Sequence, residues 1–232
     1  MNSEPHRYAT GRSLEAVLFD LDGTLVDTGP LWDEALIELV ESNGGTLHAE
    51  IVAKTHGIDS TAAVVLAYES LGWLDRDLAS DVGWVQSRVL EKLLANVPLR
   101  EGALRLLAEV RSAGIRCGLV TASYRQVVEY MLNDLGHFDV VICGDDINHT
   151  KPHPEPYLTA AVRLNVSPMN CVAIEDSPTG IASATEAGCA VLSVPSVSES
   201  SAIPPLPVIT VEELEQLVFD SQARILTRAN TS

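Results

Sequence analysis

The sequence predicts an α/β protein: a Rossmann-like, doubly wound parallel sheet with helices on both faces, interrupted by an inserted all-helical domain. Two observations support this fold class. Short apolar runs alternate with helix-sized segments along most of the 232 residues, which is typical of a parallel sheet with crossover helices. The alternation is interrupted once, between about residues 28 and 98, where helical periodicity continues without a convincing strand.

Five apolar runs are expected to be buried strands, because they are short and rich in β-branched and small apolar residues. They are Ala16–Asp20, Arg116–Thr121, Val140–Cys143, Cys171–Glu175 and Cys189–Val194. Helices are expected between the later strands at about 101–113, 124–135, 154–165 and 178–187. Right-handed crossovers would place a ligand at the carboxyl ends of the strands. Further on, Pro195–Pro207 predicts a loop, and a last helix is expected from about Val211 to Ile225.

Three segments of the insert have apolar positions at helical spacing: Trp32–Val40, Thr61–Leu71 and Asp81–Leu94. The sequence therefore predicts a core domain of residues 1–27 and 99–232 and a helical domain of residues 28–98. The insert contains all three tryptophans, Trp32, Trp73 and Trp84. We expect them to pack inside the insert unless one of them lines a pocket.

The charge is strongly acidic: 15 Lys and Arg face 32 Asp and Glu, a formal net charge of −17. A nucleic-acid binder needs a basic face, so this balance argues against one. No apolar run approaches the roughly 18 residues of a membrane helix, and Met1–Ser13 lacks the apolar stretch of a signal peptide. We therefore expect a cytoplasmic protein without a nucleic-acid or membrane partner, as a monomer or weak homodimer.

The four cysteines are widely spaced and form no CxxC pair; they are Cys117, Cys143, Cys171 and Cys189. Each lies in or beside an apolar run, where a thiol behaves as a small hydrophobe. We expect four free, structural thiols.

The most informative stretch is VLFDLDGTLVDT at 17–28. A buried strand ends on Asp20, a second acid follows at Asp22, and Gly23 turns the chain. Burying two carboxylates so close together is costly unless a cation lies between them. The pattern therefore indicates a cation site at the end of the first strand.

Three further polar groups each follow a later predicted strand. Thr121, in LVTAS, offers a hydroxyl and the following backbone N–H groups to an anion. Lys151, in TKPHPEPY, is one of only three lysines in the chain. Glu175 and Asp176, in VAIEDSPTG, form a second acidic pair. Together these groups suit a divalent hard cation and a phosphoryl group at one edge of the sheet.

This ordered set resembles the haloacid dehalogenase-like superfamily of phosphotransferases. Its four motifs match DLDGT at 20–24, TAS at 121–123, Lys151 with its PxPxxY-like run, and EDS at 175–177. The insert resembles the helical cap of the subfamily that contains phosphoglycolate phosphatase and β-phosphoglucomutase. The resemblance covers residues 15–220 and is much more specific for the superfamily than for a substrate.

The resemblance implies that Asp20 is a nucleophile that forms an aspartyl phosphate. Asp22 would be the acid/base, with its backbone carbonyl binding Mg²⁺. The other metal ligands would be Asp20, Asp176 and, directly or through water, Glu175. The phosphoryl oxygens would be held by Thr121, Ala122 and Lys151.

The resulting hypothesis is a Mg²⁺-dependent phosphatase for a small phosphorylated metabolite, a sugar phosphate or a phosphoglycolate-like ester. The insert would select the leaving group. Candidate substrate contacts are His56, Asp59 and Ser60 in the loop around Gly57, and Arg125 beyond the second strand.

Two alternatives remain open. A β-phosphoglucomutase-like mutase is disfavoured because its cap-loop arginine would fall near Ser60 and its histidine near Trp32. A catalytically silent binding protein is disfavoured because all the motif acids are present. Within the superfamily, Asp22 disfavours a dehalogenase. Schiff-base chemistry would need a cap lysine, and the cap has only Lys54 for this role, upstream of the expected position.

Overall fold

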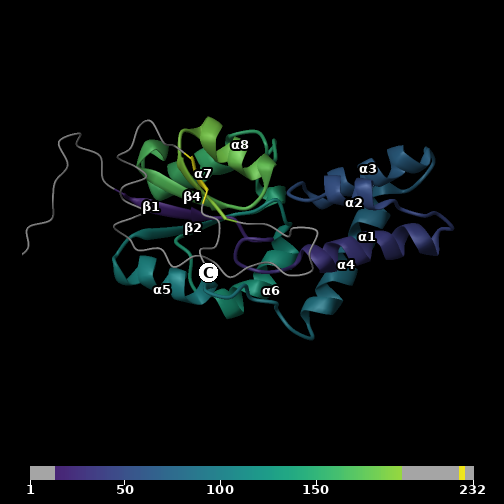
Figure 1. Cartoon of the computed structure of the whole chain (residues 1–232), viewed down its shortest axis with the longest axis horizontal. Coiled ribbons are helices and arrows are strands. Elements are labelled where there is room, and N and C mark those ends of the chain that lie inside the picture. Colours follow the sequence, from purple (N-terminus) through teal and green to yellow (C-terminus); the bar gives the residue numbers. More distant parts are fainter. Residues whose placement is uncertain (1–13, 195–224, 228–232) are drawn as a thin grey trace, which may run out of the picture.

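The computed structural model describes residues 14–194 and 225–227. Its parallel strands form one sheet in the order β3-β2-β1-β4-β5-β6 (Figure 1). The strands are β1 (Ala16–Phe19), β2 (Arg116–Val120), β3 (Val140–Ile142), β4 (Cys171–Glu175), β5 (Ala190–Ser193) and β6 (Ile225–Thr227). Strands β2 and β3 lie on one side of β1, and β4, β5 and β6 follow on its other side. The carboxyl end of β1 therefore lies where the strand order reverses. Open α/β sheets bind their ligands at this point.

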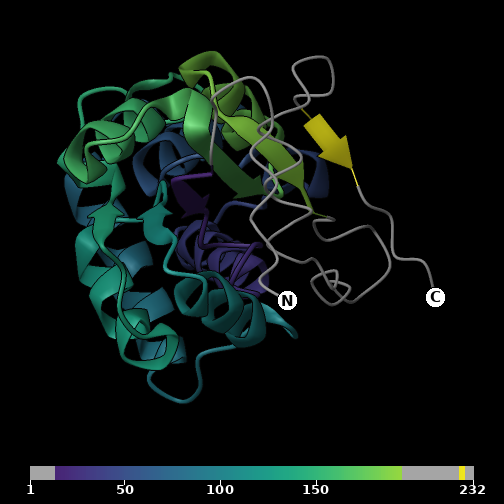
Figure 2. The same ribbon diagram turned by 90° about the vertical axis from the view of Figure 1, so that its left-hand side faces the viewer.

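Helices cover both faces of the sheet. Helices α5 (Ala103–Ser112) and α6 (Arg125–Leu135) lie on one face. Helices α7 (Glu155–Leu164) and α8 (Pro178–Ala187) lie on the other, and Figure 2 shows the two pairs on opposite sides of the strands. Two short 3-10 helices, η1 (Gly144–Asp146) and η2 (Pro168–Asn170), complete the connections. The predicted fold class is confirmed.

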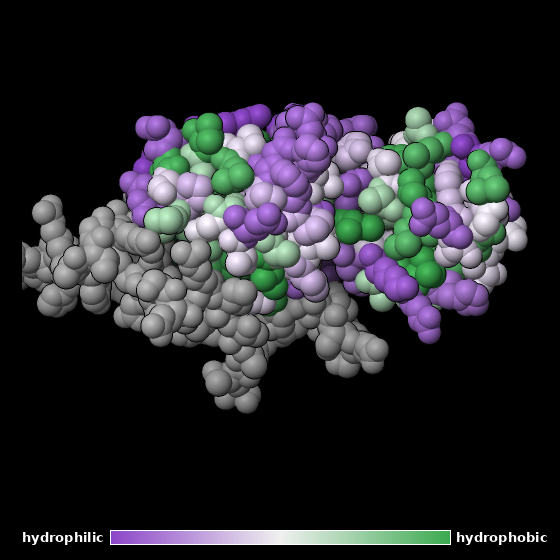
Figure 3. All heavy atoms as spheres, turned by 90° about the horizontal axis from the view of Figure 1, so that it is seen from above, coloured by the Kyte–Doolittle hydropathy of each residue, from purple (hydrophilic) through white to green (hydrophobic). Residues whose placement is uncertain are grey.

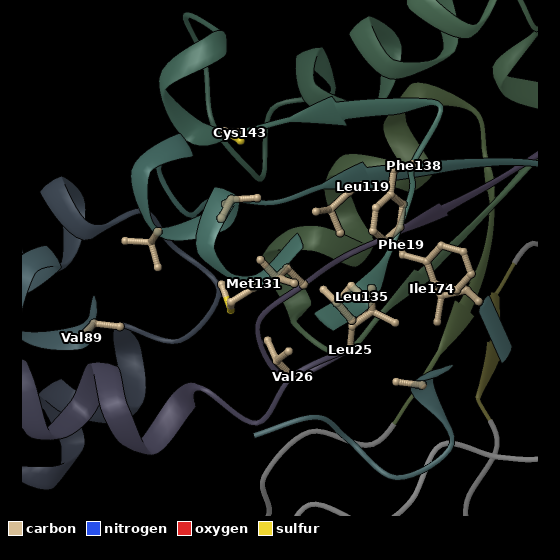
Figure 4. Close-up of a cluster of buried hydrophobic side chains, with 14 of the residues drawn as sticks. Phe19, Leu25, Val26, Val89, Leu119, Met131, Leu135, Phe138, Cys143 and Ile174 are labelled. Atoms are coloured by element: carbon tan, nitrogen blue, oxygen red, sulfur yellow. The ribbon is translucent and has the colours of Figure 1, made fainter. Parts of the chain in front are cut away.

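The alternating side chains of β1 explain this double cover. Val17 and Phe19 pack into the larger cluster with apolar residues of α5 and α6, part of which Figure 4 shows. Ala16 and Leu18 point the other way, into a cluster with α7 and α8. All four are fully buried, as expected for a central parallel strand covered on both sides.

Of the five helices between β1 and β2 in the sequence, the first four lie beside the sheet in space (Figure 1). They are α1 (Gly29–Ser42), α2 (Ala49–Lys54), α3 (Ser60–Leu71) and α4 (Leu78–Leu93), called the insert below. Helix α4 packs against α1, α3 and the core helix α6. Figure 3 shows hydrophobic residues among hydrophilic ones on the surface of the insert. Among the described residues, no helix is both long and apolar enough to cross a membrane.

Side chains and prolines define several helix starts. Asp59 accepts a hydrogen bond from the Ala62 N–H (3.0 Å) at the start of α3, and Asp77 accepts one from the Ser80 N–H (3.1 Å) at the start of α4. Such caps satisfy backbone donors that have no partner within the helix. Helices α1 and α8 have a proline in the first turn, where the missing N–H costs nothing, and the Ser177 hydroxyl also caps α8 by accepting from the Gly180 N–H (3.0 Å).

Two elements differ from the prediction. Helix α2 was missed because none of its residues is buried, so it has no apolar stripe to reveal it. Ile225, expected to end a helix, lies in strand β6; the rest of that predicted helix and the loop before it lie outside the described residues. The four cysteines are buried and unpaired, as predicted.

Candidate active site

The predicted motifs meet at the carboxyl edge of the sheet. Asp20 directly follows β1, and its backbone N–H donates to the Ile174 carbonyl of β4 (3.0 Å). Thr121 follows β2 in the same way, and Asp176 follows β4. Because β2, β1 and β4 are neighbours in register, the side chains after their ends converge on one place.

Lys151 lies at the centre of this place. Its ammonium group donates to Asp20 Oδ1 (2.6 Å), Glu175 Oε1 (2.5 Å) and the Val120 carbonyl (3.0 Å). The side chain is almost fully buried. Burial alone would lower the pKa of Lys151, but the charges of Asp20 and Glu175 outweigh it and raise this pKa above its ordinary value. The lysine is therefore a fixed cation beside Asp20.

Behind Lys151 lies a residue whose role the sequence did not reveal. Tyr157 is fully buried, and its hydroxyl donates to Glu175 Oε1 (2.6 Å). The other oxygen of Glu175 accepts from the hydroxyl of Ser177 (3.2 Å). These contacts give Glu175 a role other than the two metal-ligand roles that the sequence left open: it holds Lys151. The available signal was the tyrosine that ends TKPHPEPY.

Three carboxylates crowd together in front of the lysine, two of them buried and the third, Asp176, half-buried. Asp20, Glu175 and Asp176 each offer an oxygen within 4.8 Å of the others. Burial and the charge of Glu175 raise the pKa of Asp20 well above its ordinary value despite the attraction of Lys151. The same two causes raise the pKa of Asp176 to about 7. One lysine therefore does not balance the negative charge of this cluster.

The cluster fits a divalent cation. Asp20 Oδ2 is buried and has no hydrogen-bond partner among the described residues. A buried, unsatisfied carboxylate oxygen is costly, and a hard cation with oxygen ligands would satisfy it. The turn at Gly23 leaves room for such a site: its φ is +85°, and an added Cβ would lie 2.1 Å from Asp176 Oδ2.

Asp22 is oriented differently. Its Oδ1 accepts hydrogen bonds from the Thr28 hydroxyl and from the indole N–H of Trp32 (3.0 Å). Its Oδ2 accepts from the hydroxyls of Ser123 (2.7 Å) and Thr121 (3.2 Å). The side chain therefore faces the hydroxyl groups after β2, and the sequence did not indicate that Trp32 or Ser123 contacts it.

A cavity of about 450 Å³ lies between the core and the insert. Asp20, Asp22, Thr121, Ala122, Lys151 and Asp176 line it from the core. The insert contributes Trp32, Asp33, Lys54, His56, Ile58 and Ser60. This volume suits a small metabolite. The motif residues and the predicted contacts His56 and Ser60 thus share one enclosed space.

His56 contacts Asp33 in the wall of this cavity. Its Nε2 lies 3.1 and 3.2 Å from the two carboxylate oxygens of Asp33. The hydrogen bond to Asp33 raises the pKa of His56 above its ordinary value, although burial opposes this. The insert therefore presents a hydrogen-bonded His56–Asp33 pair to the cavity.

Two predicted substrate contacts have other partners. Arg125 pairs with Asp146 on the core, and its backbone N–H donates to Asp145 (2.9 Å). Asp59 caps α3 and accepts from the Thr150 hydroxyl (3.0 Å). Neither lines the cavity that the described residues enclose, which corrects the expectation from the sequence: Arg125 holds the loop after β3, and Asp59 links the insert to the loop of Lys151.

The insert touches the core beside the cavity through two further contacts. The carbonyl of Gly57 accepts from the Thr179 hydroxyl (2.6 Å), and the hydroxyls of Thr61 and Tyr124 lie 2.8 Å apart. Gly57 has φ +75°, and an added Cβ would lie 2.6 Å from Ser177 Cβ and 2.7 Å from Thr179 Oγ1. Glycine is therefore required both for the turn and for the close approach to α8.

Replacing Gly57 with alanine should lower kcat/KM by roughly tenfold to a hundredfold, since a misplacement of about 1 Å can have that effect. The added methyl would push the insert away from α8. Gly72→Ala is the matched control, because Gly72 also has a positive φ (+68°) but nothing within 4 Å of the added Cβ. Both variants should lose about 1 kcal/mol of stability from the backbone. Equal kcat/KM values for the two variants would contradict this reading of the contact.

Sequence comparison identifies the family to which this site belongs. The profile of the haloacid dehalogenase-like hydrolases matches residues 14–188. The chain therefore belongs to the haloacid dehalogenase-like hydrolases, and the family that its motifs resemble is confirmed. The prediction of a phosphoric monoester hydrolase of this type is confirmed as well.

Three similar proteins illustrate the relationship. Hexitol phosphatase B of Escherichia coli is 32% identical over 177 residues, which cover 75% of this chain and 80% of that protein. The phosphorylated carbohydrates phosphatase of Thermotoga maritima is 34% identical over 180 residues, covering 75% and 82%. Among solved structures, β-phosphoglucomutase of Clostridium difficile has a TM-score of 0.71 at 27% identity, covering 78% of this chain and 84% of its own.

Proposed function

We propose that this protein is a Mg²⁺-dependent phosphatase that hydrolyses a small phosphomonoester, a sugar phosphate or phosphoglycolate-like compound, through an aspartyl phosphate on Asp20. One observation supports this most directly. Asp20 has one oxygen fixed by Lys151 and the other buried without a partner among the described residues, beside the cavity. That is the arrangement expected of a carboxylate nucleophile next to a cation site.

The residues that would hold Mg²⁺ are Asp20 and Asp176, through their carboxylates, and Asp22, through its backbone carbonyl. When bound, the ion would neutralise charge on the phosphoryl group and on the attacking carboxylate. Glu175 would stay behind Lys151 and influence the ion through its charge. The acidic cluster supports a metal site of this kind.

The reaction would then occur in two steps. Thr121, the N–H groups around Ala122, and Lys151 hold the phosphoryl oxygens. A carboxylate oxygen of Asp20 bonds to phosphorus as the ester P–O bond breaks, and Asp22 gives a proton to the leaving oxygen. In the second step Asp22 takes a proton from water, the water oxygen bonds to phosphorus, and the acyl phosphate bond breaks to restore Asp20.

We further propose that residues 28–98 form a cap that moves on a core of residues 1–27 and 99–232. Two linkers that run side by side support this: the Asp27 N–H donates to the Pro98 carbonyl (2.7 Å), and Val26 bridges Leu99. Closure would exclude water while the phosphoryl group is transferred. The buried, unpaired cysteines support action in the cytoplasm, and we expect a monomer or weak homodimer.

The experiment that tests the function is a screen of phosphorylated metabolites with Mg²⁺, in which release of inorganic phosphate from several small phosphomonoesters is expected. The second candidate function is the mutase, which is supported by the likeness to β-phosphoglucomutase structures. It is tested by incubation with β-glucose 1-phosphate and catalytic glucose 1,6-bisphosphate. Rapid formation of glucose 6-phosphate with little free phosphate would replace the phosphatase with the mutase.

Mg²⁺ should stabilise the protein more strongly as the pH rises toward about 7. The pKa of Asp176 is raised from 3.8 to about 7 in the folded, metal-free protein. Between these values the folded state binds more protons than the unfolded state, so its free energy of unfolding falls as pH rises. Mg²⁺ competes with those protons, and its affinity should grow over the same range.

Thermal unfolding with chelator and with saturating Mg²⁺, at pH values from about 5 to 8, measures this effect. The increase in Tm caused by Mg²⁺ should widen with pH and level off above the pKa of Asp176, near 7. In Asp176→Asn the pH-dependent part should shrink, because no proton is displaced at that position and only Asp20, whose pKa is also raised, still contributes. A Mg²⁺ effect independent of pH in the wild-type protein would refute the assignment.

A further inference from the structure

Trp32 joins the insert to the carboxylate of Asp22. We propose that Trp32 is a positioning residue: its indole N–H fixes Oδ1 of Asp22 as a hydrogen-bond acceptor, so that Oδ2 is the oxygen that passes the proton to the leaving group. This inference rests on the proposed function, in which Asp22 is the acid/base. It assigns a role to a cap residue and to one oxygen of the carboxylate.

The two oxygens of Asp22 have different surroundings. Oδ1 is held by Trp32 Nε1 (3.0 Å) and by the hydroxyl of Thr28. Oδ2 is held by the hydroxyls of Ser123 (2.7 Å) and Thr121 (3.2 Å), on the side of the proposed phosphoryl site. Trp32 is partly buried against the core cluster and lines the cavity, so its ring is fixed by packing as well as by the hydrogen bond.

The chemistry of the donors distinguishes the two oxygens. A hydroxyl group both donates and accepts, so Thr28, Thr121 and Ser123 can each reverse their hydrogen bonds when Asp22 gains a proton. An indole N–H can only donate. A proton on Oδ1 would have one partner that cannot accept it, the N–H of Trp32, and only Thr28 that can, whereas both partners of Oδ2 are hydroxyls that can accept a proton.

The location of Trp32 adds a consequence for timing. Trp32 lies in α1, the first helix of the insert, while Asp22 belongs to the core loop after β1. The hydrogen bond therefore depends on how the insert sits on the core. A shift of α1 away from Asp22 would remove the donor that orients the acid, so proton transfer is set up when the insert is in the position seen here.

The test separates proton donation from other effects by changing the leaving group. An alkyl phosphomonoester releases a basic alkoxide that needs a proton, whereas p-nitrophenyl phosphate releases a stabilised phenolate that needs little help. Trp32→Phe keeps an aromatic ring and removes the N–H. We expect kcat/KM for the best alkyl substrate of the screen to fall by roughly tenfold or more, and that for p-nitrophenyl phosphate to fall several times less. A general acid contributes about 10²–10⁴ in rate, so a partial loss is expected.

A second variant removes the N–H without changing the shape of the ring: benzothienylalanine at position 32 replaces it with sulfur. This variant should show the same dependence on the leaving group even if Trp32→Phe folds poorly. Trp73→Phe is the control, because Trp73 packs against Tyr68 and Arg76 within the insert. The ratio of the two kcat/KM values should stay at the wild-type value in this control.

An unchanged ratio in the benzothienylalanine protein would overturn the proposal, whether both activities fell equally or neither fell. Equal falls are the signature of a merely structural role. Failure of the proposed function is recognised separately, because the wild-type protein would then release no phosphate from any monoester.

Discussion

Asp20→Asn should reduce turnover by roughly a thousandfold or more, as expected when a nucleophile is removed. The amide keeps the size of the side chain but does not form an acyl phosphate. Phosphate release from the best substrate of the screen, with saturating Mg²⁺, is the measurement. Retention of even a tenth of wild-type activity would show that the covalent mechanism is wrong.

The same substitution should leave stability unchanged or raise it in the metal-free protein. Burial and Glu175 raise the pKa of Asp20, so its charge is unfavourable in the folded state and its removal relieves repulsion. Thermal unfolding in chelator measures this, with Asp75→Asn, an exposed acid of the insert, as the control. A less stable Asp20→Asn protein would mean that the lost activity reflects damage to the fold.

Lys151→Met should also abolish most of the activity, because it removes the cation that contacts Asp20 at 2.6 Å and would hold a phosphoryl oxygen. A loss of roughly a hundredfold to a thousandfold is expected from electrostatic stabilisation of this kind. The control is Lys92→Met, which removes a lysine that pairs with Glu34 and Glu38 on the insert. Comparable activity of the two variants would contradict the role of Lys151.

Unlike Asp20→Asn, the Lys151→Met protein should be clearly destabilised. Glu175 is fully buried and would lose its charged partner, a change that costs about 3–5 kcal/mol. The loss should be largest near neutral pH and smaller in acid, where Asp20, whose pKa is raised, takes up a proton. Denaturant unfolding at two pH values measures it. For Lys92→Met the change should stay near 1 kcal/mol or less, as for partly exposed pairs.

The sequence revealed the sheet and the motif residues for a physical reason. Each buried strand is short, continuous and apolar, and Asp20, Thr121 and Asp176 each follow the end of one. Parallel neighbouring strands bring their ends together, so sequence position alone placed these residues in one site. Helix α2 left no such signal, because none of its residues is buried.

Contacts between distant side chains were not predictable in the same way. Trp32 was expected to pack in the insert or to line a pocket; it lines the cavity, but its hydrogen bond to Asp22 depends on how α1 sits on the core. Arg125 was expected in the site, but Asp146, 21 residues further along the chain, pairs with it. Tyr157 ends the motif around Lys151, but the sequence alone does not show that its hydroxyl donates to Glu175 (2.6 Å).

The central claim is that Asp20 carries the phosphoryl group during turnover. Rapid acid quench of the enzyme with its best substrate and Mg²⁺, followed by peptide mass spectrometry, tests it most directly. The account predicts a phosphoryl group on Asp20 that forms and decays fast enough to explain the rate of phosphate release, and its absence in Asp20→Asn. Phosphate release at the full rate while Asp20 stays unmodified throughout a single turnover would contradict the account.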